Sequence, residues 1–368
     1  MSRRVLLGGL AGAAAAATLG APAASAGERH GQGRRPGIPE RGASLVLLGT
    51  KGGPPLDADR AGICSALVVD GAVYLVDVGR SATTQYFRSG LGFADLAGVF
   101  VTHLHADHVA DYANLFLLGG HMRAVQGDTL PDSTPVYGPG PAGGLPPTHG
   151  GGTSPTTSPE DPTPGLLALT DSVMDAYAYH TNYFMRNSGI RETRSLADVR
   201  EIEPPVGASF EEVAPPMDAV VVHEDDRVRV SAVLVPHGAA YPCFAYRFDT
   251  DHGSVTFSGD TSYSANLERM ARGSDVLVHE AINVEGWDGP ESVRAHLVDG
   301  HVEVQQVGGV AQRAEAEHLV LSHLGDLAAE GDLDARQWRR WAQQGYDGRV
   351  TVGDDLDVFT LQHTRRRR

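Results

Sequence analysis

The segment THLHADH at residues 102–108 constrains this chain more than any other feature. It follows an apolar, strand-like run and precedes a helix-like one. In extended backbone His103 and His105 point to the same side, so both imidazoles can reach one metal ion. Asp107 and His108, on the turn into the helix, are then free to face a second ion. Four potential ligands in so short a segment favour a metal site over surface histidines without a role.

Three further candidate ligands follow apolar, strand-like runs elsewhere in the chain. His237 ends the run VLVP, Asp260 ends FSG, and His323 ends LVLS. Taken singly, each also fits a capping aspartate or a hydrogen-bonded core histidine. Together with the first segment they provide five histidines and two aspartates, which can hold two zinc-like ions with one carboxylate shared. Zinc is the expected metal, although Mn²⁺ or iron also suits such a ligand set.

Short apolar runs and helix-like stretches alternate in two blocks, which predicts two packed β-sheets flanked by helices, an α/β (α+β) fold. The expected strands of the first block are Ser44–Leu48, Ser65–Val69, Val73–Val78 and Gly98–Thr102. Those of the second block are Ala219–Val222, Val228–Val235, Phe244–Phe248, Ser254–Ser258, Val276–His279, Leu319–Ser322, Val350–Val352 and Asp357–Leu361. The expected helices are Ser81–Gly90, Ala106–Gly119 and Val302–Ala314.

The first 26 residues predict an export signal. Arg3 and Arg4 precede a Gly/Ala-rich run that ends at Ala24-Ser25-Ala26, which is typical of a twin-arginine leader cleaved before Gly27. A stable membrane anchor is disfavoured because the run is short and poor in Leu and Ile. We therefore expect a periplasmic or extracellular protein, with a flexible segment at 27–43, one domain at 44–362 and a basic tail at 363–368.

The charge balance bears on the substrate. The chain carries a formal net charge of −16, and loss of the leader with Arg3 and Arg4 makes it more acidic. Such a surface repels phosphate backbones, so extended nucleic acid is an unfavourable partner. The two cysteines are too few for a disulfide scaffold or a cysteine-based zinc site, although Cys64 and Cys243 could pair in an oxidising compartment.

The middle of the chain differs from the rest. Residues 138–164 are rich in Gly, Pro, Ser and Thr, which predicts a flexible insertion. Residues 166–187 then look helical and carry a cluster of aromatic side chains. This helix could pack on the core or form a lid over an active site. Either it or an edge of the sandwich could mediate a homodimer.

Several motifs together resemble the metallo-β-lactamase superfamily, and within it the ribonuclease Z and zinc arylsulfatase branch. They are LGTKGGP at 48–54, VDVG at 76–79, THLHADH, VYGP at 136–139, PHG at 236–238, SGDT at 258–261, HEA at 279–281 and LSH at 321–323. The resemblance implies an αββα sandwich of two mixed β-sheets with the metals at one edge.

The resemblance also implies a role for each ligand. His103, His105 and His237 would bind one metal, Asp107, His108 and His323 the other, and Asp260 would bridge them. Asp77 would orient a ligating histidine. His301, 22 residues before His323, would contact the scissile group and protonate the leaving oxygen, with Glu280 holding its tautomer. The residues after it, Val302 and Glu303, depart from the hydroxyl residues usual in this branch, so a structural histidine is the alternative.

A site of this kind predicts ester hydrolysis. Two ions would lower the pKa of a shared water, and the resulting metal-bound hydroxide, oriented by Asp107 and Asp260, would attack the substrate. The interval from His237 to Asp260 is too short for the tRNA-gripping arm of ribonuclease Z. We therefore expect an exported, arylsulfatase-like or phosphodiesterase hydrolase of small anionic esters. The alternatives are a ribonuclease Z-type phosphodiesterase or endoribonuclease, and a non-catalytic metal-dependent binding protein.

Overall fold

The computed structural model describes residues 38–120, 127–148, 151–327 and 333–361, which lie within one compact unit, Gly31–Arg368. The expected leader at 1–26 and the basic tail at 363–368 lie outside the described residues, so export stays a prediction. Of the expected flexible segment, Ile38 is instead buried in the core and a strand begins at Ala43. Within the described ranges, no helix combines the length and the apolar character needed to cross a bilayer.

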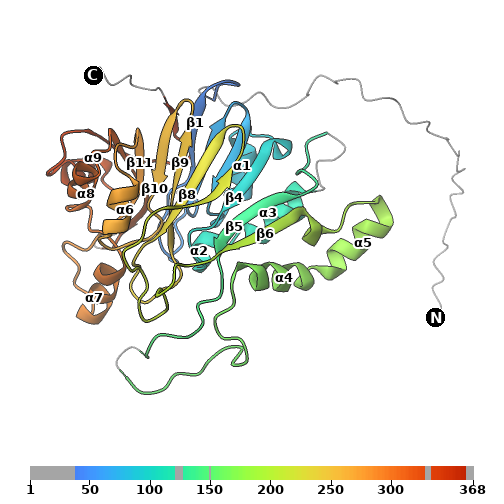
Figure 1. Ribbon diagram of the computed structural model, residues 1–368, viewed down its shortest axis with the longest axis horizontal. Coiled ribbons are helices and arrows are strands. Elements are labelled where there is room, and N and C mark those ends of the chain that lie inside the picture. The colour runs from blue at the N-terminus through green and yellow to red at the C-terminus, as the bar shows by residue number, and fades with distance from the viewer. Residues whose placement is uncertain (1–37, 121–126, 149–150, 328–332, 362–368) are drawn as a thin grey trace, which may run out of the picture. The chain divides into compact units, whose positions relative to one another are not determined.

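Two mixed β-sheets form the centre of the described unit (Figure 1), which confirms the expected fold class. The first sheet has the order β14 (Val358–Leu361), β1 (Ala43–Gly49), β2 (Cys64–Val69), β3 (Ala72–Val76), β4 (Leu96–Phe100), β5 (Thr134–Pro139) and β6 (Ala197–Ile202). The second has the order β13 (Arg349–Val352), β12 (His318–Asp326), β11 (Val276–Asn283), β10 (Gly253–Phe257), β9 (Phe244–Thr250), β8 (Val228–Leu234) and β7 (Val220–Glu224).

Strand β1 shows why buried strands appear in the sequence as continuous apolar runs. Every residue of β1 is buried, and successive side chains point to opposite faces of the sheet. Leu45 and Leu47 face the core between the two sheets, whereas Val46 and Leu48 face the core under the helices of the first sheet. A strand covered on both faces needs apolar residues at every position.

Helices cover the outer face of each sheet (Figure 1). The first sheet carries α1 (Ala82–Arg88), η1 (Phe93–Asp95), α3 (Tyr112–Gly119) and α4 (Leu166–Ala176), followed by α5 (Ala178–Ser188) and η3 (Thr193–Leu196). The second carries α6 (Ala265–Met270), α8 (Val307–Arg313) and α9 (Ala335–Ala342). Within the described residues, the other helices are α2 (Ala106–Val109) and α7 (Glu291–Gly300). Helix, sheet, sheet and helix layers therefore follow one another.

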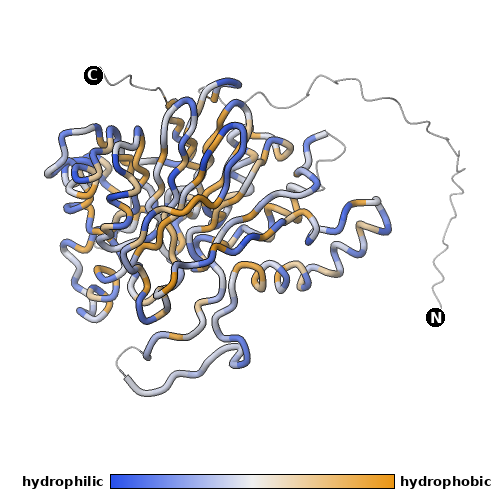
Figure 2. The backbone as a smooth tube through the Cα atoms, in the orientation of Figure 1, coloured by the Kyte–Doolittle hydropathy of each residue, from blue (hydrophilic) through white to orange (hydrophobic). Residues whose placement is uncertain are grey.

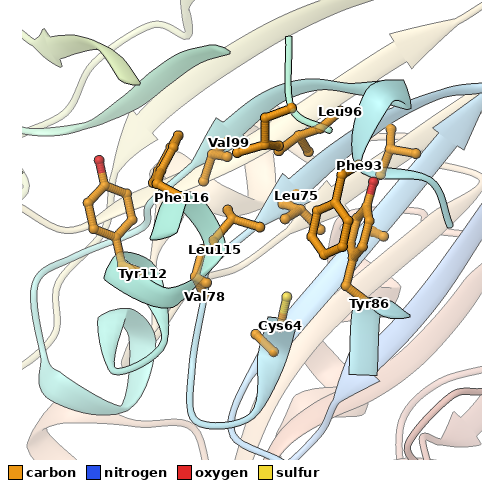
Figure 3. Close-up of a cluster of buried hydrophobic side chains, with 14 of the residues drawn as sticks. Cys64, Leu75, Val78, Tyr86, Phe93, Leu96, Val99, Tyr112, Leu115 and Phe116 are labelled. Carbon is orange, nitrogen blue, oxygen red and sulfur yellow. The ribbon is translucent and has the colours of Figure 1, made fainter. Parts of the chain in front are cut away.

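The core under the helices of the first sheet is dense in aromatic side chains (Figure 3). Tyr86 and Phe93 stack with their ring centroids 5.0 Å apart. Tyr112 and Phe116 of α3 meet edge to face. Figure 2 shows that hydrophobic residues are concentrated on the strands and hydrophilic residues on the loops.

The two cysteines lie on opposite sides of the sandwich. Cys64 is part of the core under the helices of the first sheet, and Cys243 is part of the corresponding core of the second sheet. Both are buried free thiols. Burial raises the pKa of each thiol well above its ordinary value. The pairing that the sequence left open is therefore not formed.

Several elements differ from the sequence-based expectation. β5 reads as a turn in the sequence because it contains Pro135, Gly138 and Pro139, which disfavour strands. β6 carries charged residues because it is an edge strand. The helix expected from Val302 begins at Val307, and α6, α7 and α9 were not expected.

The insertion also differs at its borders. Gly138 and Pro139 end β5, and the described residues beyond them up to Gly165 form neither helix nor strand. The single helix expected at 166–187 is two helices, α4 and α5, which meet at Tyr177. α4 packs on the core through Leu166 and Met174, whereas most of α5 is exposed. The lid that the aromatic cluster suggested stays a prediction.

Candidate metal centre

The carboxyl ends of parallel strands meet at one edge of the sandwich, where loops gather functional groups. In the first sheet β3 is parallel to β4, and Asp77 and the THLHADH segment follow these two strands. In the second sheet β10 is parallel to β11 and β11 to β12. Asp260 follows β10, and His323 lies within β12. β8 runs in the same direction as β10, since both are antiparallel to β9, so His237 reaches the same edge.

Two hydrogen bonds join the sheets beside this edge. The backbone N–H of Phe244 donates to the carbonyl oxygen of Thr102 at 2.9 Å. The hydroxyl of Tyr246 donates to the carbonyl oxygen of Val101 at 2.8 Å. Val101 and Thr102, which precede the first histidine of THLHADH, are thus fixed against the second sheet. The ligands from the two sheets are therefore held in fixed positions relative to one another.

The first ligand set consists of His103, His105 and His237, whose ligand nitrogens all lie within 4.8 Å of one another. The Nε2 atom of His237 is 3.2 Å from Nδ1 of His105. His103 and His237 are buried, but His105 is exposed. This set has no carboxylate of its own.

The second ligand set consists of Asp107, His108, Asp260 and His323, with ligand atoms again within 4.8 Å of one another. The Nε2 atom of His323 lies 3.3 Å from Oδ2 of Asp107 and 3.1 Å from Oδ2 of Asp260. The Nε2 atom of His108 lies 3.4 Å and 3.3 Å from the same two oxygens. This set is more acidic and more deeply buried than the first.

Asp260 lies between the two sets. Its Oδ2 atom, which is close to His108 and His323, is also 3.9 Å from Nε2 of His103 and 3.7 Å from Nε2 of His237. The side chain is only 3% exposed. One carboxylate therefore faces ligand nitrogens of both sets, which is the arrangement that a bridging ligand requires.

Buried atoms without hydrogen-bond partners show that metal ions fit this cluster. Nε2 of His103, Nε2 of His108 and Oδ1 of Asp260 are buried and accept or donate no hydrogen bond among the described residues. Such orphans are rare in protein interiors and need an explanation. Imidazole nitrogens and carboxylate oxygens that face one another are the donor set of zinc and related ions. The residues present thus fit two divalent ions, and the metal's identity is open.

The protonation states suit metal binding in the first set. Burial lowers the pKa of His103 and His237, and it lowers that of His105 to about 4. These imidazoles are therefore neutral at pH 7 and keep a lone pair, as a metal ligand must.

The protonation states differ in the second set, because its carboxylates raise the pKa of the histidines beside them. Burial raises the pKa of Asp107 and Asp260, but His108 and His323 more than reverse this and hold both carboxyls well below their usual range. Burial lowers the pKa of His323, yet the same carboxylates outweigh it and raise the value to about 9. Two carboxylates, one of them fully buried, thus attract positive charge at this point, which a divalent cation supplies.

Asp77 holds His108 in place. Its Oδ2 atom is 2.8 Å from Nδ1 of His108, and its Oδ1 atom accepts a hydrogen bond from the backbone N–H of Thr102 at 2.8 Å. The Thr102 hydroxyl adds a third contact at 2.9 Å. With Nδ1 engaged, Nε2 of His108 is the nitrogen that faces the second set.

Two residues of the site adopt a left-handed backbone that side chains rarely take. Asp77 has φ 60° and His323 has φ 51°. Such strain is typical of functional positions and persists only where the surroundings enforce it. At His323 the cause is a β-bulge, because the register between β11 and β12 shifts between His279 and Ala281. A Cβ on Gly52 would lie 2.6 Å from Nδ1 of His323, so only glycine fits against the ring.

His301 and Glu280 lie beside the two ligand sets. Nδ1 of His301 is 3.2 Å from Oε2 of Glu280, whose Oε1 accepts a hydrogen bond from the backbone N–H of Val302 at 2.8 Å. Burial lowers the pKa of His301, but Glu280 and Asp260 more than reverse this and raise it. A nitrogen of His301 also lies within 4.8 Å of ligand atoms of His237 and Asp260. The histidine therefore faces the reaction site and can carry a proton.

Sequence reasoning missed the backbone groups of the site. The carbonyl oxygen of Gly300 is 2.7 Å from Nδ1 of His237 and orients that ring. The backbone N–H of Gly53 is 3.1 Å from Oδ2 of Asp107 and 3.2 Å from Nε2 of His323. The GG pair of LGTKGGP was the only signal for the second contact. The first has no sequence signal, because any residue has a carbonyl group.

Known proteins resemble this chain in sequence. The family model of the beta-lactamase superfamily domain matches residues 167–324, a range that includes His237, Asp260 and His323. The chain is 27% identical over 323 residues to ribonuclease Z of Mycobacterium bovis (strain BCG / Pasteur 1173P2), covering 88% of this chain and 99% of that protein. It is 29% identical over 314 residues to ribonuclease Z of Mycobacterium avium (strain 104), covering 85% and 96%.

Solved structures share the fold. The short form of human tRNase Z superposes with a TM-score of 0.56 at 19% identity, over 86% of this chain and 99% of that chain. A metallo-β-lactamase fold protein from Bacillus subtilis gives 0.55 at 18% identity, over 86% and 99%. At these identities the likeness establishes the αββα architecture and no more.

Proposed function

We propose that this chain is a metal-dependent hydrolase of the metallo-β-lactamase superfamily and that the esters it cleaves are phosphodiesters. The observation that carries the proposal is the shared carboxylate, Asp260, between two ligand sets that lie beside the His301–Glu280 pair. Two neighbouring cations suit a substrate whose reacting centre is anionic. The likeness to ribonuclease Z along almost the whole length of those relatives supports a phosphodiester rather than another ester.

Bound in the two ligand sets, divalent ions would acidify a water molecule and offset charge on the phosphoryl oxygens. The protein supplies the positions. Asp107 and Asp260 are ionised and can accept hydrogen bonds from the attacking water. Asp77 and the Gly300 carbonyl keep the rings of His108 and His237 in one orientation. The ligand geometry is therefore set before the substrate binds.

His301 is the proton donor in this proposal. Its Nδ1 faces Glu280, so Nε2 is the nitrogen that can reach the substrate. The water oxygen bonds to phosphorus, the bond from phosphorus to the leaving oxygen breaks, and that oxygen takes the proton from His301. The products are an alcohol or phenol and a phosphomonoester. The proton lost by the water restores the charged form of His301.

The comparisons favour this function over the arylsulfatase-like one expected from the sequence. The Mycobacterium relatives described above carry the name ribonuclease Z, and neither name refers to a sulfate ester. The same names count against a preference for small substrates, whereas the net charge of −16 counts against a polyanion. The segment from His237 to Asp260 holds only a turn, β9 and the β9–β10 hairpin, so it contains no separate arm for gripping RNA.

Three substrates with the same chromophore test the proposal. Purified chain loaded with Zn²⁺ is offered bis(p-nitrophenyl) phosphate, p-nitrophenyl sulfate and p-nitrophenyl acetate, and release of p-nitrophenolate is measured. We expect kcat/KM for the phosphodiester to exceed that for the sulfate by about 100-fold or more, as expected for a site tuned to one charge distribution. Faster turnover of the sulfate would overturn the phosphodiesterase assignment. Two bound metals with no turnover of any ester would favour a binding protein.

His301→Ala tests the donor role separately. We expect turnover to fall about 100-fold, within the range for loss of a general acid, while two metals remain bound. His252→Ala, in the turn between β9 and β10, is the matched control and should leave turnover within about twofold, because His252 contacts Asp70 and lies outside both ligand sets and the cavity beside them. Loss of metal from His301→Ala with unchanged turnover per metal would show that the ring is a ligand instead.

A further inference from the structure

A cavity of about 480 Å³ opens directly beside the first ligand set. Five histidines line it: His103, His105, His237 and His301 belong to the metal centre, and His296 belongs to α7. Its volume lies within the range of small-molecule sites, which is about 300–1,000 Å³. Any group bound in this cavity is therefore within reach of both the metal centre and the proton donor.

The walls of the cavity are apolar and come mostly from segments outside the sandwich. The insertion contributes Leu145 and several prolines, and Phe210 and Tyr241 add aromatic rings. No Lys, Arg, Asp or Glu is present among its described lining residues. Charge in the cavity is therefore confined to its histidines.

The insertion forms a defined wall. The backbone N–H of Ala142 donates to the carbonyl oxygen of Thr163 at 3.3 Å, which joins the two limbs of the insertion at its base. The ring of Phe210 packs so closely on Gly144 that a Cβ there would lie 2.2 Å from it. The wall is thus tied both to itself and to the segment before β7.

The composition of the wall decides what can bind. A polynucleotide brings a second phosphate next to the scissile one, and that charge would be desolvated against proline, leucine and phenylalanine with no cation beside it. A sugar would lose hydrogen bonds to water without regaining them. An aryl or alkyl group loses nothing, and its burial is favourable in proportion to its area.

We propose that this cavity binds the leaving group of the substrate and that this group is uncharged and apolar, such as a phenol. The proposal rests on the phosphodiesterase function above, because it assigns one of the two ester groups of that substrate. His301 fixes which group it is. The same ring that donates the proton to the leaving oxygen lines the cavity, so the leaving group and not the retained one occupies it.

Two variants change the cavity without touching the metal ligands. Leu145→Arg brings a charge to the apolar wall at a side chain that is 48% exposed, so folding should tolerate it. Ala142→Phe fills the space instead. Leu118→Arg is the matched control, because Leu118 is 45% exposed on α3 and does not line the cavity. Leu145→Met keeps the apolar character and should behave as the wild type.

Binding of a neutral apolar probe, N-phenyl-1-naphthylamine, is measured by fluorescence on the full chain with and without Zn²⁺. We expect Leu145→Arg and Ala142→Phe to weaken probe binding about 10-fold, the loss expected when one apolar contact area is removed or blocked. Bis(p-nitrophenyl) phosphate should displace the probe from the wild type. Equal probe affinity in the wild type and both variants would overturn the proposal.

Kinetics give the second measurement. With p-nitrophenyl phosphodiesters, Leu145→Arg should raise KM about 10-fold and change kcat by less than about twofold, because the contact is made equally in the ground and transition states. An unchanged KM would contradict the assignment. If the wild type turns over no phosphodiester, the proposed function fails, but probe binding still tests the cavity independently.

Discussion

The two ligand sets of the candidate centre differ in charge and in exposure. The first contains three histidines, one of which, His105, is exposed. The second contains two carboxylates and two histidines, and one of those histidines is held by a third carboxylate, Asp77. A divalent ion in the second set gains more Coulomb energy, because two carboxylates face it there. The structure thus predicts a tight site and a weaker, accessible one that share Asp260.

The largest effect is expected from the shared ligand. Asp260→Ala removes a carboxylate that faces both sets, so we expect fewer than one metal per chain and a loss of turnover of at least about 1,000-fold. Metal analysis and phosphodiester kinetics measure both. Asp275→Ala is the control, because that carboxylate accepts hydrogen bonds from Ser254 and lies outside both sets. Retention of both metals in Asp260→Ala would show that the two ligand sets do not share Asp260.

A smaller effect should separate the two sets. His105→Ala removes an exposed ligand from the weaker site, so we expect about one metal per chain to remain. His323→Ala removes a buried ligand from the tighter site and leaves Asp107 and Asp260 without that partner. It should cost both metal and thermal stability. If His105→Ala lost both ions while His323→Ala lost one, the assignment of tight and weak sites would be reversed.

Asp77 tests whether the hydrogen bond to His108 makes the second set tighter. Asp77→Asn keeps the shape of the side chain but removes the charge that fixes the ring tautomer. We expect metal affinity of the second set or turnover to fall about 10- to 100-fold, the usual cost of losing such a partner. The first set has a backbone carbonyl in this role, at Gly300, so its affinity should be unaffected. Equal weakening of both ions would contradict this.

The smallest predicted effect is on the pH dependence. Burial lowers the pKa of His301, but Glu280 and Asp260 raise it above its usual value, while His323 opposes them. The protonated donor is present below this pKa, so turnover should fall as the pH rises through it. Glu280→Gln lowers the pKa of His301, and the alkaline fall in kcat should begin at a lower pH. If Glu280→Gln leaves the alkaline limb of the kcat profile unchanged, His301 is not the group that titrates there.

The ligands of the two sheets also differ in how easily they could be predicted from the sequence. THLHADH was recognisable because one strand end and one helix turn supply four ligands in succession. The ligands of the second sheet are more than 20 residues apart, and each looked ordinary alone; only the parallel strands bring Asp260 and His323 together. The bulge at His323 and the carbonyl of Gly300 depend on register and backbone path, which no side-chain pattern encodes.

The fold shows the same limit. Buried strands such as β1 were predicted to within a residue or two, because both faces are covered and every residue is apolar. β5 and β6 were missed because prolines and edge charges hide them. The cavity walls come from the insertion, whose Gly- and Pro-rich sequence predicts a loop but not the contact between Gly144 and Phe210.

The metal content of the wild-type chain shows whether it binds two ions in ligand sets that share Asp260. The full chain is saturated with Zn²⁺, dialysed, and measured by inductively coupled plasma mass spectrometry against the protein concentration. Two ligand sets that share Asp260 predict about two zinc ions per chain, one of which a weak chelator removes first. Fewer than one ion per chain, or two ions that are released together, would contradict the account.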